Sequence, residues 1–438
     1  MWGYLKSAAD PGISPSQTLI YALPALPLAL PTLVLFIYLP TLYVEEFGLD
    51  LALVGALLML ARFGDLLLDP WVGTLNDRAS ARQQRLLMTT GALICAVGLF
   101  WLTRPVNNWP GASLLLSLSL LYFGWTLVQI PYLAMLPGLT SSHQSRTRVA
   151  SLREGLGVVG LLLSAAIPVF LITRGETQLE AMRALTNITI VLVALTLGIL
   201  VFRLHWPAHR AITSTGKIRT VLRNRPARTL MLAWFSNGLA NGIPGVLFPL
   251  YVTEVLGSDE AGRAQLILIY FVAAILSLPL WWFASHYCSR KRLWQGAMLV
   301  AVIAFLPAAM LGSGDFSWFL IICLATGAML GADLALPQAL QADVCDWHRI
   351  RYGRDQSGLL FALWNVCTKL ALALAALLAF GLLDLSGFNQ SEGEAGALAL
   401  IYAFLPCVFK LVAVTLMQRF SLTEATHQRI VARLNNRR

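Results

Sequence analysis

The hydrophobic positions of the chain fall into long unbroken runs that short polar stretches separate. These runs lie at about 16–44, 51–76, 86–103, 110–137, 149–173, 184–203, 229–256, 262–286, 293–312, 316–341, 357–384 and 396–420. Most are about 20 residues or longer, the length that a helix needs to cross a hydrocarbon layer of about 30 Å. They lack the alternation with period two that a membrane β-barrel requires. The pattern therefore predicts an all-α membrane protein with twelve transmembrane helices.

The polar stretches predict how these helices are grouped. The longest, over 205–228, is basic and separates six hydrophobic runs from six. We therefore expect an N-terminal half over 1–204, a linker over 205–228, a C-terminal half over 229–420 and a tail over 421–438.

Charge in the shorter loops predicts the orientation in the membrane. Basic residues gather after every second run, at Arg78, Arg82 and Arg85, at Arg146 and Arg148, at Arg290, Lys291 and Arg292, and at Arg349, Arg351 and Arg354. The intervening loops are richer in acidic residues. Because positive loops stay on the cytoplasmic side, both termini, the linker and the tail are predicted to be cytoplasmic.

Composition excludes several classes of protein. The chain is 57% hydrophobic and 12% charged over 438 residues, with a mean hydropathy of +0.69, which is too apolar for a soluble domain. The net charge of +10 is spread over short loops, so we expect no nucleic-acid partner. The six cysteines show no CxxC spacing, which argues against a disulfide framework or a zinc site. No cofactor is expected. The first hydrophobic run is too long for a signal-peptide core, so it is interpreted as a retained helix.

Two acids lie inside the second hydrophobic run. Asp65 and Asp69 are four residues apart, which places both carboxylates on one helix face. Each is costly in lipid, and together they repel unless a cation lies between them or one is protonated. The alternative is an ion pair with Arg62 that only holds helices together. Pro70 and the nearby Gly73 loosen this helix and favour a Na⁺ or H⁺ site.

Other polar residues lie at membrane depth. Lys369 is deep in the eleventh run and could balance the two acids. Lys410 is interpreted as a structural or interfacial lysine. Asn237 and Asn241, one turn apart, either contact substrate or join helices.

Three stretches resemble one family. They are ARFGDLLLDPWVGTLNDR, IPYLAMLPGLTSSHQSRTRVASLREGLGVVG and ADVCDWHRIRYGRDQSGLLFALWNVCTK. In this order they resemble the glycoside-pentoside-hexuronide:cation symporters, the group of the melibiose permease, and the likeness runs over all twelve segments. Six plus six helices around a basic loop also resemble the major facilitator fold, in which two halves alternate around a midplane site.

The resemblance implies roles for individual residues. It places Asp65, Asp69 and Thr126 at the cation site, where Na⁺ is possible, with Lys369 and Arg153 providing charge balance and coupling. Residues assigned to the substrate cavity are Gln129, Tyr132, Trp364, Asn237 and Asn241. It also places Asp343 and Asp346 at a cytoplasmic gate. Asp77 and Arg78 are assigned to the same gate from their position at the cytoplasmic end of the second run, where they either lock the resting conformation or cap the helix.

Departures from the family pattern bear on the substrate. Ala29, Gln129 and Leu133 stand where the galactoside carriers have two acids and a sugar-stacking aromatic residue. The cavity thus becomes more positive, which favours a uronide or another acidic sugar over melibiose. We expect a monomeric secondary transporter in a bacterial inner membrane that couples the uptake of a small organic solute to Na⁺ or H⁺. Alternatives are a carrier of lysophospholipid-like amphiphiles, and an exporter or facilitator. An enzyme is disfavoured, because no histidine pairs with an intramembrane nucleophile.

Overall fold

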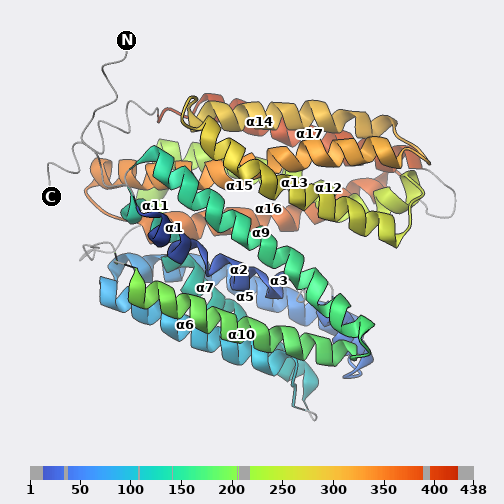
Figure 1. Ribbon diagram of the computed structural model, residues 1–438, viewed down its shortest axis with the longest axis horizontal. Helices are drawn as coiled ribbons and strands as arrows, with labels where there is room; N and C mark the ends of the chain where they lie inside the picture. The colour runs from blue at the N-terminus through green and yellow to red at the C-terminus, as the bar shows by residue number, and fades with distance from the viewer. Residues whose placement is uncertain are drawn as a thin grey trace. The chain divides into compact units, whose positions relative to one another are not determined.

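The computed structural model describes residues 13–33, 38–106, 109–140, 142–204, 206, 218–387 and 395–422 (Figure 1). Within these ranges the regular structure is helical and no strand occurs. Among the described residues, ten helices are long and apolar enough to cross a membrane. They cover the second to the sixth and the eighth to the twelfth of the predicted segments. The all-α membrane fold is therefore confirmed.

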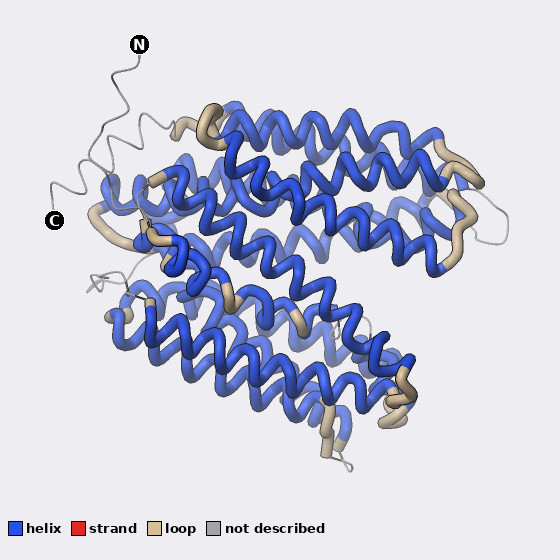
Figure 2. The backbone as a smooth tube through the Cα atoms, viewed as in Figure 1, coloured by secondary structure: helices blue, strands red, loops and turns tan. Residues whose placement is uncertain are grey.

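The first predicted segment is not one continuous helix. Its described residues form α1 (Pro15–Ala22), α2 (Ala25–Ala29), α3 (Pro31–Leu33) and α4 (Leu39–Glu45), and residues 34–37 lie outside the described part of the chain. Figure 2 shows the turns that interrupt it. Pro24 precedes α2 and Pro31 begins α3, and a proline cannot donate the backbone hydrogen bond that would continue the preceding helix. The expectation of an unbroken helix over 16–44 is wrong for this reason.

The chain packs as two compact units. Unit 1 comprises Met1–Ile218 and His348–Leu363, and unit 2 comprises Arg219–Trp347 and Trp364–Arg438. Two long helices, α15 (Phe316–Tyr352) and α16 (Ser357–Leu385), therefore pass from one unit into the other. Half of the predicted linker, residues 205 and 207–217, and the tail from residue 423 lie outside the described residues.

Unit 1 is a bundle in which α7 packs against both α5 and α6. Its longer helices are α5 (Leu51–Arg78), α6 (Ala81–Leu102), α7 (Pro110–Ala134), α9 (His143–Thr173) and α10 (Gln178–Arg203), with the short α8 (Leu136–Leu139) between α7 and α9. α10 lies beside α6, and α1 and α2 pack on α9 (Figure 1). A Cβ at Gly124 of α7 would lie 2.4 Å from the backbone nitrogen of Cys95 on α6. Small residues thus bring α6 and α7 into close contact, as is common in membrane bundles.

Unit 2 is built around α12 and α17. Its elements are α12 (Arg225–Leu250), η2 (Tyr251–Val255), α13 (Glu260–Ala284), α14 (Arg290–Phe305), η3 (Leu306–Met310) and α17 (Ala395–Gln418), and the short α11 (Ile218–Leu222) precedes them. α17 packs against α12 and α14. A Cβ at Gly242 of α12 would lie 2.7 Å from Cβ of Ala375 on α16, so these two helices are also in close contact.

Several basic residues that were assigned to loops lie on helices instead. Arg146 is in the first turns of α9, is fully buried, and donates to the carbonyl oxygens of Thr140 and Pro137. Arg349 and Arg351 lie in the last turn of α15, where the helix dipole favours positive charge. The loops are shorter than predicted because these arginines bind the free carbonyl groups at helix ends or interact with the helix dipole.

Candidate functional site

The two intramembrane acids of α5 meet Thr126 of α7. The hydroxyl oxygen of Thr126 lies 3.2 Å from Oδ1 of Asp65 and 3.0 Å from Oδ1 of Asp69. The three residues are only 3%, 1% and 1% exposed. A hydroxyl has one proton and can donate to one carboxylate at a time. The structure therefore brings three oxygen atoms together at a buried point in unit 1.

The sequence of α5 explains how these acids are held. Asp50 caps the helix by accepting from the amides of Ala52 and Leu53. Further along, Pro70 lies inside the helix directly after Asp69 and leaves the carbonyl of Leu66 without its intrahelical donor. The backbone next to the acid pair is thus less completely hydrogen-bonded than the rest of α5.

Arg62 lies at the edge of this group. Its Nη1 is 3.7 Å from Oδ2 of Asp65, and its guanidinium lies over the ring of Tyr122 at 4.5 Å. The side chain of Arg62 is 37% exposed, whereas that of Asp65 is 3% exposed. This long, partly solvated contact is weaker than a hydrogen-bonded ion pair. An Arg62 pair alone therefore gives a poor account of the buried carboxylates.

Arg153 and Tyr132 form a second group in unit 1. The hydroxyl of Tyr132 donates to the carbonyl oxygen of Tyr21 at 2.6 Å, and the hydroxyl of Tyr21 donates to the carbonyl oxygen of Tyr132 at 3.0 Å. The Arg153 guanidinium lies 5.7 Å from the centroid of the Tyr132 ring, within cation–π range, and also pairs with Glu154. Gln129, one turn before Tyr132, is half-buried.

The predicted gate residues lie in two different contacts. Within unit 1, the Asp77 carboxylate accepts from the amides of Gly358 at 2.6 Å and Leu359 at 3.0 Å, at the start of α16. Within unit 2, Asp343 pairs with the buried Arg290. Asp346 is buried as well, whereas Arg78 is exposed. The structure thus shows Asp77 as a cap for the N-terminus of another helix.

The remaining predicted residues belong to unit 2. Trp364 is buried and stacks on Trp234, with ring centroids 4.5 Å apart, and Trp234 donates to the hydroxyl of Thr368 at 2.7 Å. Lys369 is partly buried on α16, and its predicted role beside the acids stays a prediction. Asn237 and Asn241 do come together, but around a different residue: both accept from Lys410.

Sequence reasoning missed Asp333 and Trp294, which complete the group around Lys410. Asp333 accepts from Lys410 at 2.9 Å and from Trp294 at 2.6 Å. Asp333 is an acid inside a hydrophobic run, so the rule that singled out Asp65 and Asp69 would have identified it.

Comparison with known proteins decides the family. The family model described as MFS/sugar transport protein matches residues 20–424. The chain belongs to this family. The result confirms the resemblance to the glycoside-pentoside-hexuronide:cation symporters of the major facilitator superfamily.

Several individual proteins are similar over nearly the whole chain. A glucuronide carrier protein homolog of Escherichia coli K12 is 21% identical, over 92% of this chain and 91% of its own. The inner membrane symporter YicJ of the same organism is 23% identical, over 88% and 87%. Among solved structures, the E. coli fucose:proton symporter has a TM-score of 0.70 at 14% identity, covering 93% of this chain and 99% of its own, which shows the shared fold. The protein is thus an integral membrane transporter, and the hypotheses of an enzyme and of an exporter or facilitator are not favoured.

Proposed function

We propose that the protein is a symporter that couples the uptake of an acidic sugar, such as a uronide, to one monovalent cation across a bacterial inner membrane. The observation that carries this proposal is the convergence of Asp65, Asp69 and Thr126. The symporters named among its relatives support the coupling.

The chemistry of the three oxygens favours Na⁺ over H⁺. Two carboxylates that share one hydroxyl repel each other at close range, and a cation between them removes this repulsion. A hydroxyl oxygen can serve a metal cation as a third ligand, as oxygen atoms do for other hard cations. A proton binds to a single base, so an H⁺ site does not require the other two oxygens to converge on the same point.

The proposed cargo is anionic. Arg153 is buried at 4% exposure, lies against the Tyr132 ring and pairs with Glu154, so a buried guanidinium lies next to residues predicted for the substrate cavity. A relative is named as a glucuronide carrier homolog, and a glucuronide is an acidic sugar. Planar guanidinium groups bind carboxylates well. Lysophospholipid-like amphiphiles also carry an anionic group, and a ligand screen distinguishes them from uronides.

Transport into proteoliposomes tests the coupling. An imposed inward Na⁺ gradient at equal pH on both sides should drive concentrative uptake of a radiolabelled glucuronide. Uptake driven only by a pH gradient, with no response to Na⁺, contradicts the Na⁺ site. No uptake of any acidic sugar under either gradient contradicts the proposed cargo.

Two matched threonine variants test the site itself. Thr126→Val removes the shared hydroxyl and keeps the side-chain volume, so it should weaken Na⁺ activation about tenfold, the effect of losing a contact of about 1.4 kcal/mol. Thr189→Val is the control, because Thr189 is equally buried but bonds the carbonyl of Leu185 in its own helix. Equal Na⁺ activation curves for both variants would remove Thr126 from the cation site.

A further inference from the structure

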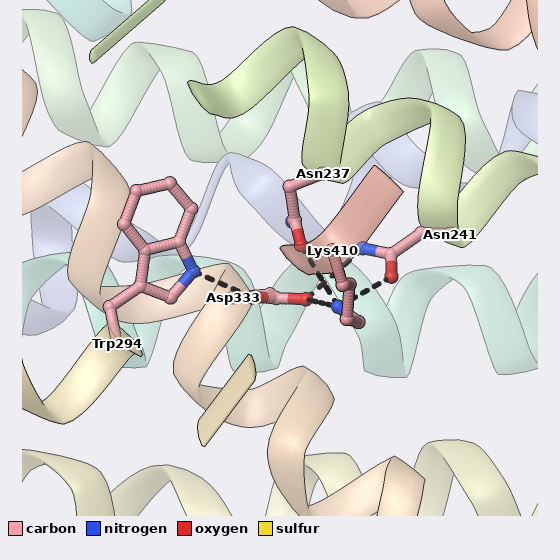
Figure 3. Close-up of polar contacts among 5 residues, drawn as sticks. All are labelled: Asn237, Asn241, Trp294, Asp333 and Lys410. Carbon is pink, nitrogen blue, oxygen red and sulfur yellow. Dashed lines mark hydrogen bonds and ion pairs between the residues drawn. The ribbon is translucent and has the colours of Figure 1, made fainter. Parts of the chain in front are cut away.

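Five polar side chains from four helices of unit 2 form a cluster in which Asn241 and Lys410 are half-buried and the other three are buried (Figure 3). Lys410 comes from α17, Asp333 from α15, Asn237 and Asn241 from α12, and Trp294 from α14. Asn237 and Trp294 are fully buried, and the side chains of Asp333 and Lys410 are 5% and 12% exposed. The cluster thus lies inside the helix bundle of this unit, whereas the acid pair of α5 belongs to unit 1.

Every donor of the Lys410 ammonium has an acceptor. Nζ lies 2.9 Å from Oδ1 of Asn237, 3.0 Å from Oδ1 of Asn241 and 2.9 Å from Oδ2 of Asp333. An ammonium group has three N–H donors and no acceptor, so these three oxygens from two helices, α12 and α15, satisfy it completely. The arrangement is that of a positively charged lysine.

The orientation of Asn237 shows which group organises the cluster. Its Oδ1 faces the ammonium, while its Nδ2 finds no hydrogen-bond partner among the described residues. A buried amide with an unpaired N–H is unfavourable. The opposite orientation would place Nδ2 against the ammonium. The positive charge of Lys410 therefore gathers the oxygen atoms around itself.

Asp333 balances this charge. Its Oδ1 accepts from Nε1 of Trp294 at 2.6 Å, and its Oδ2 accepts from Nδ2 of Asn241 at 3.1 Å as well as from Lys410. The carboxylate is thus ionised, held on both oxygens, and neutralised by the lysine.

We propose that this cluster is a monovalent-cation site of unit 2 and that the tethered ammonium of Lys410 is its resident cation. Carboxylate and carbonyl oxygens are the ligands that hard cations take from proteins, and here three of them surround one positive charge. In unit 1 the carboxylates of Asp65 and Asp69 converge on a hydroxyl group instead. Unit 2 therefore supplies its own cation, and an exchangeable ion enters at unit 1 alone. This last consequence rests on the proposed function, whereas the site itself does not.

A pair of substitutions with different volumes tests the site. Lys410→Ala removes the ammonium and leaves space for an inorganic cation next to Asp333. Lys410→Met removes the ammonium but fills that space. The measurement is the apparent Tm of the purified full-length protein in NaCl, KCl or choline chloride at about 0.15 M, so that ionic strength is equal in all three.

We expect both variants to lose on the order of 5–10 °C in choline, because an uncompensated carboxylate remains buried. NaCl or KCl should restore at least half of this loss in Lys410→Ala and none of it in Lys410→Met. Adding Asp333→Asn should restore Lys410→Met in all three salts. If a single variant yields no folded protein, the amount of monodisperse protein in the Lys410→Met/Asp333→Asn double variant is compared with that of Lys410→Met.

Two outcomes would overturn the proposal. One is an equal response of the Ala and Met variants to NaCl, KCl and choline, which a lysine that only joins helices would give. The other is a double variant that is no more stable, or no better folded, than Lys410→Met. The series is repeated with Asp69→Asn, which removes the unit 1 site. If the Tm of Lys410→Ala still rises in NaCl or KCl in the Asp69→Asn background, the cation site of unit 2 is supported independently of the proposed function.

Discussion

The contact between Asp77 and the first turn of α16 gives a prediction whose size follows from the structure. Asp77→Ala removes a carboxylate that accepts from two amides, at 2.6 Å and 3.0 Å, and that is itself 3% exposed. Hydrogen bonds to a charged group contribute about 1.5–3 kcal/mol each. When this helix end opens, water can form hydrogen bonds to the freed amides and recovers part of that free energy. The net loss is therefore about 2–3 kcal/mol, which shifts the local opening of the α16 N-terminus on α5 roughly 30- to 150-fold.

Hydrogen exchange measures this opening directly. The amides of Gly358 and Leu359 should exchange faster by the same factor in Asp77→Ala. In a Ser357→Cys background, where position 357 is 6% exposed, alkylation should accelerate in parallel. Arg78→Ala is the matched control, because Arg78 is the next residue on α5 but is exposed. Unchanged exchange at Gly358 and Leu359 in Asp77→Ala would refute the role of Asp77 as a cap for the N-terminus of α16. An equal effect of Arg78→Ala would mean that the faster exchange follows from any change of charge at this end of α5.

Further predictions concern packing and cargo. Gly124→Leu should abolish the folded protein in detergent, because its Cβ would lie 2.4 Å from the Cys95 backbone nitrogen. Gly198→Leu is the control and should leave the protein folded, because a Cβ at Gly198 has nothing within 4 Å. Size-exclusion profiles measure the amount of folded protein in each variant. Arg153→Ala should raise the KM for a glucuronide at least tenfold and leave that for a neutral glycoside nearly unchanged, because one charge-assisted contact to the carboxylate is lost. Equal effects on both substrates would speak against an anionic cargo bound at Arg153.

The hydrophobic runs predicted most of the fold because lipid requires every backbone donor to be satisfied within a helix. The same reasoning failed for the first segment. Average hydropathy does not register that Pro24 and Pro31 each remove a backbone donor, and these two prolines stand where the segment is interrupted. The signal was present in the sequence, but in the identity of single residues.

The acid pair was predictable because its spacing is local to one helix. Asp65 and Asp69 are four residues apart, so a helix places them on one face whatever surrounds it. Thr126 is different, since its hydroxyl reaches them only through the packing of α7 on α5. The hydrophobic pattern of α7 does not show which way the Thr126 side chain points. Only the resemblance to a family placed Thr126 at the cation site. Lys410 and Asp333 are 77 residues apart in sequence, and nothing local to either residue indicates the other.

The charge of the cargo and the number of coupling ions together decide which gradient can drive transport. If unit 2 keeps its own cation at Lys410, one Na⁺ enters with each substrate, and a uronide of charge −1 makes the transported pair electrically neutral. A tenfold Na⁺ gradient then contributes about 1.4 kcal/mol and supports about tenfold accumulation. The membrane potential contributes nothing, although about 100 mV would add about 2.3 kcal/mol for each net charge moved. Glucuronide accumulation in vesicles at a fixed Na⁺ gradient should therefore not change when a potassium diffusion potential is imposed. A rise that approaches roughly 50-fold would mean that a second cation moves with the substrate, and the one-ion scheme would then be wrong even with the Asp65 and Asp69 site intact.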